Sequence, residues 1–461
     1  MPHAQPQPSS FTSAPVGQVL LRTAAPIILV MTLSGSLNLV DAAFVGWYVG
    51  PPGVAAVSAS FPVFAVIIAL STMVSSGMAS QLARRLGAQE IDAAQKLFSS
   101  AHGLALAMAA ALALVFACVG APLTGMLSGG DPAVSAMAWR YLAILIGAGP
   151  VIFCLSLHVD GLRSEGRAMM MAGLSVLVTL VNIGLNYLLI GMLGLGVAGS
   201  ALGTAAAQAL ALALVLILRG RIETPLPRAA LLAHPWHGGW ARILTLGAPL
   251  SLNFIGLALI ASLIIAAIQI AGSDTYLSTI AAYGLLTRLI GFAFLPLMGL
   301  AQAMQAVVGN NVGAGLPARS DRALLLALIA AFAYCAAVEA IFIANAPRLG
   351  ALFLQDAAII SELGRILRPI MTLYALTGPI LILGLYFQAI GDAGRAALLT
   401  LSKPYALQPP LILLLVLGFG EPGIWLAVPA ADLLLATLAL ILCLRLRRPG
   451  QPGFALPAAP A

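Results

Sequence analysis

The sequence predicts an all-α protein that crosses a membrane many times. Of its 461 residues, 61% are hydrophobic and only 8% are charged, whereas a soluble domain carries roughly 25% charged residues. The apolar residues lie in runs of about 20 to 30, the length that a helix needs to span a bilayer. These runs lack the period of two that is typical of a membrane β-barrel. Polar residues are therefore too few for a soluble protein of this size.

Apolar length and turn residues divide the chain into twelve predicted spans, six in each half. Their approximate limits are 20–48, 54–83, 97–127, 135–161, 168–192, 196–218, 242–271, 278–308, 322–346, 360–388, 396–418 and 423–444. The longest polar connection follows span six. We therefore predict five regions: a cytoplasmic N-terminal tail (1–19), an N-terminal lobe of spans one to six (20–218), a cytoplasmic linker (219–241), a C-terminal lobe of spans seven to twelve (242–445) and a disordered cytoplasmic tail (446–461).

The basic residues predict the side of the membrane that each connection faces. Most of the 22 Lys and Arg residues fall at alternate span ends, in the mid-chain linker or after span twelve, and Arg395 and Lys403 are assigned to the connection after span ten. Short connections rich in Lys and Arg face the cytoplasm. Both termini are thus predicted to be cytoplasmic, in the inner membrane of a bacterium. The net charge of +7 fits this topology, and no nucleic-acid partner is expected.

The two halves of the chain resemble each other at an offset of about 225 residues. For example, LRTAAPIIL (21–29) aligns with LTLGAPLSL (244–252), and GVAGSALG (196–203) aligns with GEPGIWLA (420–427). Because six spans is an even number, two such lobes share one orientation and are related by a pseudo-twofold axis along the membrane normal, around a central cavity. This architecture suits alternating access.

Motifs for nucleotide hydrolysis and metal chemistry are missing from the sequence. A Walker A motif needs Gly before its lysine, but Lys96 follows Gln95 and Lys403 follows Ser402. The five histidines form no His-Glu-x-x-His motif, and the four cysteines have no metal-type spacing. We therefore expect no enzyme activity, no cofactor and no metal site. Secondary transport is the remaining class.

Several segments in both halves resemble the MATE family, the multidrug and toxic compound extrusion transporters. They are Gly87-Ala88 and Gly313-Ala314, GLAQAMQAVVGNNVGAG (299–315), LRSEGR (162–167), QAIGDAGR (388–395) and GVAGSALGTAAAQ (196–208). The resemblance covers residues 18 to 445. It implies two six-helix lobes in the MATE fold and efflux of organic, often cationic, drugs against inward H⁺ or Na⁺. We expect small-molecule drugs and membrane lipids as partners, and a protein that works as a monomer.

Carboxylates at bilayer depth are costly, and each is a candidate for function. Four lie within or beside the spans: Asp41, Asp160, Glu339 and Asp432. Asp160 is expected to be solvated or to pair with Arg163, and Asp432 to bind backbone freed by Pro429. Glu339 is left open between a cavity-facing role and a pairing role at a helix end.

Asp41 has the strongest case, because span five offers Asn182 and Asn186 four residues apart on one helix face. In the DinF-like branch of the MATE family, a carboxylate on helix one faces a polar cluster on helices four, five and six. The resemblance places that cluster here at Tyr141, Asn182, Asn186 and Thr204, around Asp41 as the ion-coupling residue. In the internal repeat, Asp41 corresponds to Ile264, so coupling is expected in the N-terminal lobe alone.

The sequence departs from the DinF-like pattern at Asn186, where this branch usually carries a second aspartate. A hard cation such as Na⁺ prefers several charged oxygens, so we predict coupling through one proton on Asp41. A Na⁺-coupled drug antiporter remains an alternative, as does a flippase or exporter of a lipid-linked or polysaccharide precursor. Candidates for the lining of the substrate cavity are Phe153, Met171, Met298, Met304 and Gln305, although such residues more often pack between helices.

Overall fold

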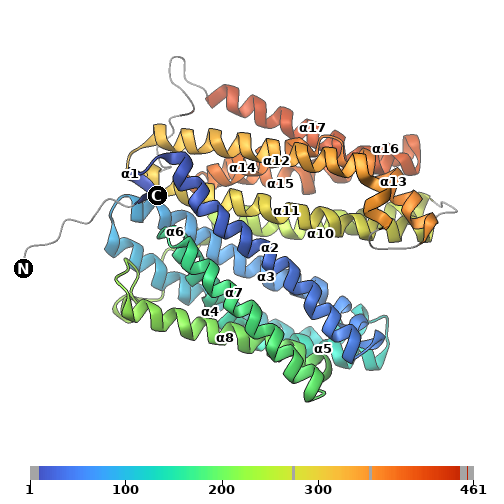
Figure 1. The fold of residues 1–461 in the computed structure, drawn as a ribbon, viewed down its shortest axis with the longest axis horizontal. Helices are drawn as coiled ribbons and strands as arrows, with labels where there is room; N and C mark the ends of the chain where they lie inside the picture. The colour runs from blue at the N-terminus through green and yellow to red at the C-terminus, as the bar shows by residue number, and fades with distance from the viewer. Residues whose placement is uncertain (1–9, 272–275, 352–355, 447–453, 455–461) are drawn as a thin grey trace, which may run out of the picture. The chain divides into compact units, whose positions relative to one another are not determined.

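The structure is a computed structural model that describes residues 10–271, 276–351, 356–446 and 454 (Figure 1). Regular structure in these ranges is entirely helical. The predicted N-terminal tail (1–19) is described from Ser10 onward. The predicted disordered tail (446–461) lies outside the described residues except for its positions 446 and 454.

The chain folds as two compact units. The N-terminal unit comprises Met1–Ala14 and Ala25–Ser251, and the C-terminal unit comprises Pro15–Ala24 and Leu252–Ala461. The predicted linker (219–241) therefore packs within the N-terminal unit. Helix α2 contributes its first residues to one unit and the rest to the other, and the change falls next to Pro26.

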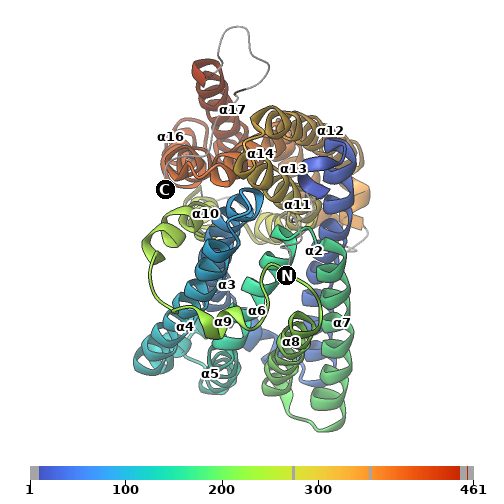
Figure 2. The ribbon, with the colours of Figure 1, turned by 90° about the vertical axis from the view of Figure 1, so that its left-hand side faces the viewer.

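Helices α1 to α9 and the start of α10 build the N-terminal unit, apart from the first residues of α2. Their bounds are α1 Ser10–Ser13, α2 Val16–Tyr48, α3 Pro51–Gly87, α4 Ile91–Leu127, α5 Pro132–Gly147, α6 Gly149–Ser164, α7 Ala168–Asn186, the π-helix η1 Tyr187–Met192, α8 Gly196–Arg221, α9 Ala230–Ala233 and α10 Trp240–Ala271. Asp131 begins α5 by accepting hydrogen bonds from the N–H groups of Ala133 and Val134. Figure 2 shows α7 beside α8, which pack against each other.

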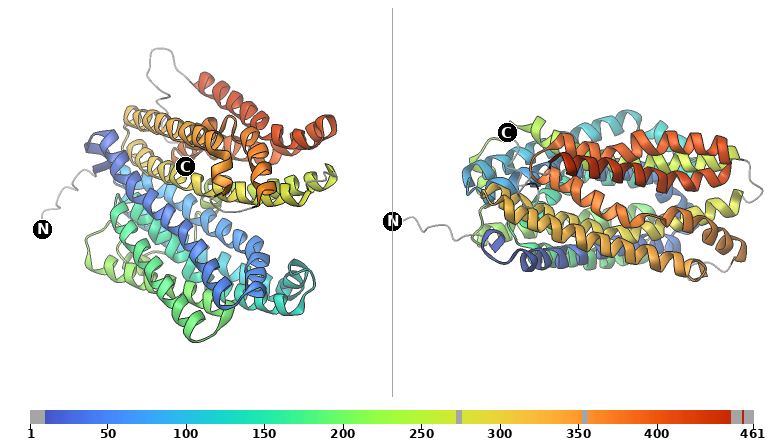
Figure 3. Two further views of the ribbon diagram at one scale, coloured as in Figure 1. Left: turned by 45° about the vertical axis from the view of Figure 1, so that its right-hand side comes forward. Right: turned by 90° about the horizontal axis from the view of Figure 1, so that it is seen from above.

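The rest of α10 and the later helices build the C-terminal unit. They are α11 Tyr276–Gly313, α12 Pro317–Ala351, α13 Ala357–Met371, α14 Tyr374–Ala389, α15 Ala393–Leu401, the π-helix η2 Ser402–Leu407, α16 Gln408–Phe419 and α17 Glu421–Leu446. Asp356 and Asp392 cap α13 and α15 at their N-termini. Helix α12 packs against α11, α13 and α14 (Figure 3).

The twelve predicted spans are confirmed within the described residues as ten helical spans and two bent pairs. One pair, α5 with α6, bends by 50°, and the other, α13 with α14, bends by 49°. These are spans four and ten, which the repeat equates. Spans five and eleven are also equivalent, and each contains a π-helical segment, η1 or η2. The repeat seen in the sequence therefore extends to irregularities of the backbone.

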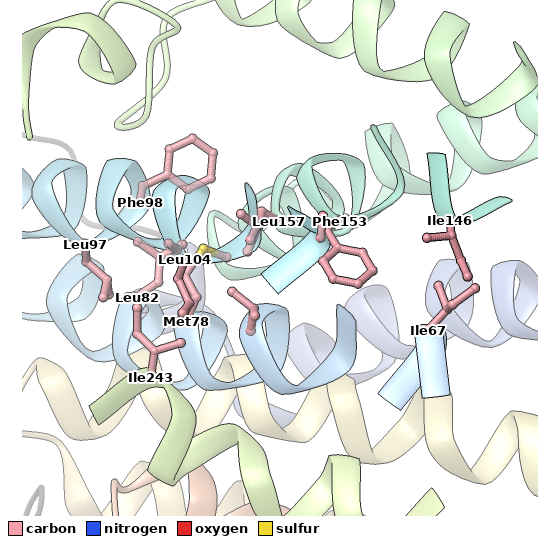
Figure 4. Close-up of a cluster of buried hydrophobic side chains, with 14 of the residues drawn as sticks. Ile67, Met78, Leu82, Leu97, Phe98, Leu104, Ile146, Phe153, Leu157 and Ile243 are labelled. Atoms are coloured by element: carbon pink, nitrogen blue, oxygen red, sulfur yellow. The ribbon is translucent and has the colours of Figure 1, made fainter. Parts of the chain in front are cut away.

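A cluster of buried apolar side chains holds α3, α4, α5 and α6 together in the N-terminal unit. Met78, Phe98, Ile146 and Phe153 belong to it (Figure 4). Arg219, in the last turn of α8, donates to Glu165 after α6 at 2.7 Å, and both side chains are completely buried. Its guanidinium also donates to the carbonyl of Leu226 in the linker at 2.9 Å, which holds the linker against the ends of α6 and α8.

Candidate functional site

Asp41 and the polar residues predicted around it come from four helices of the N-terminal unit. Asp41 lies two turns before the end of α2, and Tyr141 lies in α5. Asn182 and Asn186 belong to the last turns of α7, and Thr204 to the third turn of α8. Both asparagines are buried, whereas Asp41, Tyr141 and Thr204 are half-buried. The fold brings all five into one region of the unit.

Hydrogen bonds join four of these residues. The amide of Asn186 donates from Nδ2 to Oδ1 of Asp41 at 2.5 Å. The two ends of an amide are assigned from the bonds that they make, and Asn182 has favourable contacts with both Asp41 and Thr204 when its amino group faces Asp41, an orientation that also brings it to 3.2 Å from the amino group of Asn186. It then donates to Asp41 Oδ1 at 2.9 Å and accepts from Thr204 Oγ1 at 3.1 Å. One carboxylate oxygen thus receives two amide donors.

Tyr141 takes a different place beside this network. Its ring packs against a small apolar cluster of Val45, Ile190 and Val197. No hydrogen bond joins its hydroxyl to Asp41 within the described part of the chain. Tyr141 therefore forms the wall of the cluster rather than a direct ligand of the carboxylate.

Gly203 of α8 allows Asn186 to approach, and the sequence analysis missed this role. A Cβ atom at position 203 would lie 2.6 Å from Oδ1 of Asn186. That oxygen is buried and has no hydrogen-bond partner among the described residues. Buried acceptors are nearly always paired, so this oxygen can accept one further hydrogen bond. The repeated motif GVAGSALG contained Gly203, but only the helix packing shows why glycine stands there.

Asp41 is the only titratable group in the hydrogen-bonded network of Asp41, Asn182, Asn186 and Thr204. Within the described ranges, no group of three or more His, Cys, Asp or Glu side chains is placed to hold a metal ion. The chemistry available to the network is therefore the gain and loss of one proton, or the binding of a small cation by its oxygens.

The five predicted cavity residues are buried inside their own units. Phe153 belongs to the apolar core of the N-terminal unit (Figure 4), and Met171 is also buried there. In the C-terminal unit Met298 and Met304 are buried, and the amide of Gln305 donates to Gln388 at 3.0 Å. These contacts fit helix packing, and a cavity-lining role for these residues stays a prediction.

The other carboxylates are paired. Asp160 lies 3.1 Å from the guanidinium of Arg163, as expected. Glu339 accepts from the backbone N–H groups of Leu373 and Ala375 at 3.1 and 2.8 Å, so it caps α14 where the bent pair breaks. A charged carboxylate is favourable at a helix N-terminus.

Asp432 and Lys403 correct two expectations. Asp432 was expected to bind backbone freed by Pro429, but it accepts instead from Nζ of Lys403 at 2.5 Å. Lys403 was assigned to the cytoplasmic connection after span ten, but it lies in η2, inside the span that runs from Ala393 to Phe419. The pair could not be expected from the sequence, because its members are 29 residues apart on different helices.

Comparison with known proteins gives consistent matches along the chain. A sequence profile of the family described as MatE matches residues 26–188 and again residues 249–412. The chain is 28% identical over 444 residues to a protein of Shewanella oneidensis named "FAD transporter", covering 95% of this chain and 96% of that one. It is 25% identical over 450 residues to "Multidrug export protein MepA" of Staphylococcus aureus, covering 95% of each.

A solved structure has the same fold. It is described as the outward-facing conformation of a multidrug resistance MATE family transporter of the MOP superfamily. The TM-score is 0.87 at 24% sequence identity, and the match covers 95% of this chain and 97% of the solved one. This likeness concerns the fold of the twelve spans.

Proposed function

We propose that this chain, which belongs to the MatE family, exports drug-like organic molecules, often cations, by antiport against inward-moving protons. Members of this family are transporters rather than enzymes. The observation that carries the proposal is the hydrogen-bonded network in which Asp41 is the one group that can carry a proton. The relatives named MepA are multidrug exporters, which supports drugs as the substrate class. We place the protein in a bacterial plasma membrane with both termini in the cytoplasm, and in the DinF-like branch.

The network supplies a way to connect a proton to helix movement. An ionised Asp41 accepts N–H groups from Asn186 and Asn182, whereas a protonated carboxyl group is itself a donor. Rotation of the Asn186 amide would let its unpartnered oxygen accept that new donor. Protonation therefore favours a different set of contacts between α2, α7 and α8. Transport follows if the two arrangements bind the substrate with different affinities, since a ligand shifts states only by that difference.

Sodium coupling is the first alternative. A Na⁺ ion would find one charged oxygen at Asp41 and neutral oxygens at Asn182, Asn186 and Thr204. Hard cations prefer several charged oxygen ligands, so the asparagine at position 186 favours the proton.

Export of a larger anionic molecule is the second candidate function. The relative that is 28% identical along nearly the whole chain is named as a transporter of FAD, a dinucleotide with two phosphates. Export of a lipid-linked or polysaccharide precursor belongs to the same class of anionic substrates.

Transport by purified protein in proteoliposomes tests the proposal. Ethidium movement is measured with an imposed pH gradient, with a Na⁺ gradient and with neither, and FAD movement is measured in parallel. We expect ethidium transport that depends on the pH gradient alone. Transport driven by Na⁺ alone would select the first alternative. Movement of FAD without ethidium would select the second candidate.

A further inference from the structure

The C-terminal unit contains an ion pair at membrane depth that the proton-coupling proposal does not use. Lys403 of η2 and Asp432 of α17 are joined at 2.5 Å, and their side chains are 25% and 5% exposed. Lys403 lies ten residues beyond the start of α15, and Asp432 lies eleven residues beyond the start of α17. At 1.5 Å per residue, each is about 15 Å from its end of the span. Both charges thus lie near the middle of their spans.

An ion pair in the middle of two membrane spans is unusual. Ionisable side chains within membrane spans are rare and usually mark a pathway or a binding site. A buried ion pair is also weak evidence for a stabilising role, because the loss of hydration offsets much of the attraction. Lys403 lies in a π-helical segment, and such segments occur frequently at functional sites. Its counterpart η1 in the N-terminal unit directly follows Asn186 of the Asp41 network.

A second polar group lies on α14, a helix that packs against those of the pair. Tyr374 is the first residue of α14, at the break of the bent pair α13 and α14 that Glu339 caps. Its side chain is 7% exposed, and its buried hydroxyl has no hydrogen-bond partner in the described parts of the chain. Helix α14 packs against α17, which carries Asp432, and against α15, which continues into η2 and Lys403. Among the described residues, this hydroxyl is therefore an unused donor in the group of helices that holds the ion pair.

Lys403 and Tyr374 together have more hydrogen-bond donors than the acceptors that the described residues offer them. The ammonium group of Lys403 has three N–H donors, and Asp432 is its one hydrogen-bond acceptor among the residues described. The hydroxyl of Tyr374 adds a further donor. An anion is the ligand that would satisfy these donors, because carboxylate and phosphate oxygens accept several hydrogen bonds and bear the charge that Lys403 attracts.

We propose that Lys403 and Tyr374 form a binding subsite for an anionic group, a carboxylate or phosphate, of a transported molecule. Asp432 is the internal counter-ion, which the incoming anion replaces as the partner of Lys403. The depth of the pair favours a transported molecule over a phospholipid, whose headgroup stays at the membrane surface. This inference rests on the proposed export function and extends its substrates from cations to zwitterions and anions.

Two dyes that differ in one group test the subsite. Rhodamine 110 has a free carboxylic acid, and rhodamine 123 is its methyl ester. Binding of each to the purified full-length protein in detergent is measured by fluorescence anisotropy, without any ion gradient. We expect Tyr374→Phe to raise the Kd of rhodamine 110 relative to that of rhodamine 123 by about tenfold, as the loss of a hydrogen bond to a charged group predicts. The substitution removes only an unpaired hydroxyl, so the fold should persist.

A double variant and a matched control complete the test. Lys403→Gln with Asp432→Asn removes both charges together, which leaves no unpaired buried charge, and should abolish the preference between the dyes. Tyr283→Phe removes the hydroxyl of another buried tyrosine in the same unit, which packs near Trp425, and should leave the ratio of the two Kd values unchanged. Equal changes for both dyes in Tyr374→Phe, or no change, would overturn the proposal.

Two further measurements distinguish a transported molecule from a lipid headgroup as the bound anion, and distinguish this proposal from that of proton coupling. If phosphatidylglycerol displaces rhodamine 110 from the wild-type protein but phosphatidylcholine does not, the anion is a lipid headgroup, and the assignment to a transported molecule is wrong. If the dyes are distinguished in binding but ethidium fails to move with a pH gradient, the proposed proton coupling is wrong while the subsite stands.

Discussion

Asn186 donates a hydrogen bond to Asp41 at 2.5 Å, which links α7 to α2 across 145 positions of sequence. The amide is completely buried and cannot ionise. The charge of the contact therefore lies on Asp41 alone, and a change in its protonation alters the bond directly.

Asp41→Asn should abolish pH-driven export while the protein stays folded. An amide has nearly the shape of a carboxyl group, so the packing persists, but it cannot carry a proton. Ethidium efflux in proteoliposomes with a pH gradient measures the loss, and dye binding in detergent reports the fold. Asp131→Asn is the matched control, because asparagine caps a helix as well as aspartate does. Wild-type efflux by Asp41→Asn would refute the assignment of the proton carrier.

Asn186→Asp should widen the choice of coupling ion toward Na⁺. The change places a second carboxylate beside Asp41, and several charged oxygens are what a hard cation prefers. Efflux is measured as a function of external Na⁺ at equal pH on both sides of the membrane. Asn345→Asp is the control, because the amide of Asn345 donates to the carbonyl of Ile341 in its own helix. An unchanged response to Na⁺ would count against a cation-accessible network.

Gly203→Ala should impair coupling although it removes no polar group. The added Cβ would meet Oδ1 of Asn186 at 2.6 Å, so the amide must move away from Asp41. Since a hydrogen bond to a charged group contributes about 1.5–3 kcal/mol, we expect pH-driven efflux to fall by about tenfold or more. Gly173→Ala in α7 is the control, because its Cβ meets nothing within 4 Å. Equal efflux from the two variants would disprove the role of Gly203.

Arg219→Met should destabilise the N-terminal unit. The substitution leaves the buried Glu165 without its cation at 2.7 Å, and Arg167 at 3.7 Å compensates only in part. Loss of one member of a buried pair costs about 3–5 kcal/mol, measured as the free energy of unfolding in detergent. Adding Glu165→Gln should restore most of the lost free energy of unfolding. Lys96→Met should have little effect, because Lys96 forms an exposed pair with Asp92. Failure of the double variant to recover would contradict this account.

The sequence predicted the Asp41 network in part. The spacing of Asn182 and Asn186 placed both on one face of span five, which the structure confirms, and the family resemblance proposed their approach to Asp41. The need for glycine at position 203 was invisible, because it depends on how closely α8 approaches α7. Lys403 was wrongly assigned to the connection after span ten. A lysine near the start of an apolar run resembles a residue of the preceding connection when its partner inside the span is not known.

The sequence by itself determined the spans, their order and the repeat, because apolar length and residue spacing are local properties. It also determined which residue types are available at membrane depth. Only the tertiary structure decided their partners. It joined Asp41 to Asn186, Lys403 to Asp432 and Glu339 to the break before α14, and it left the hydroxyl of Tyr374 without a partner among the described residues. These pairings depend on packing between helices distant in sequence, and hydropathy contains no information about distances between them.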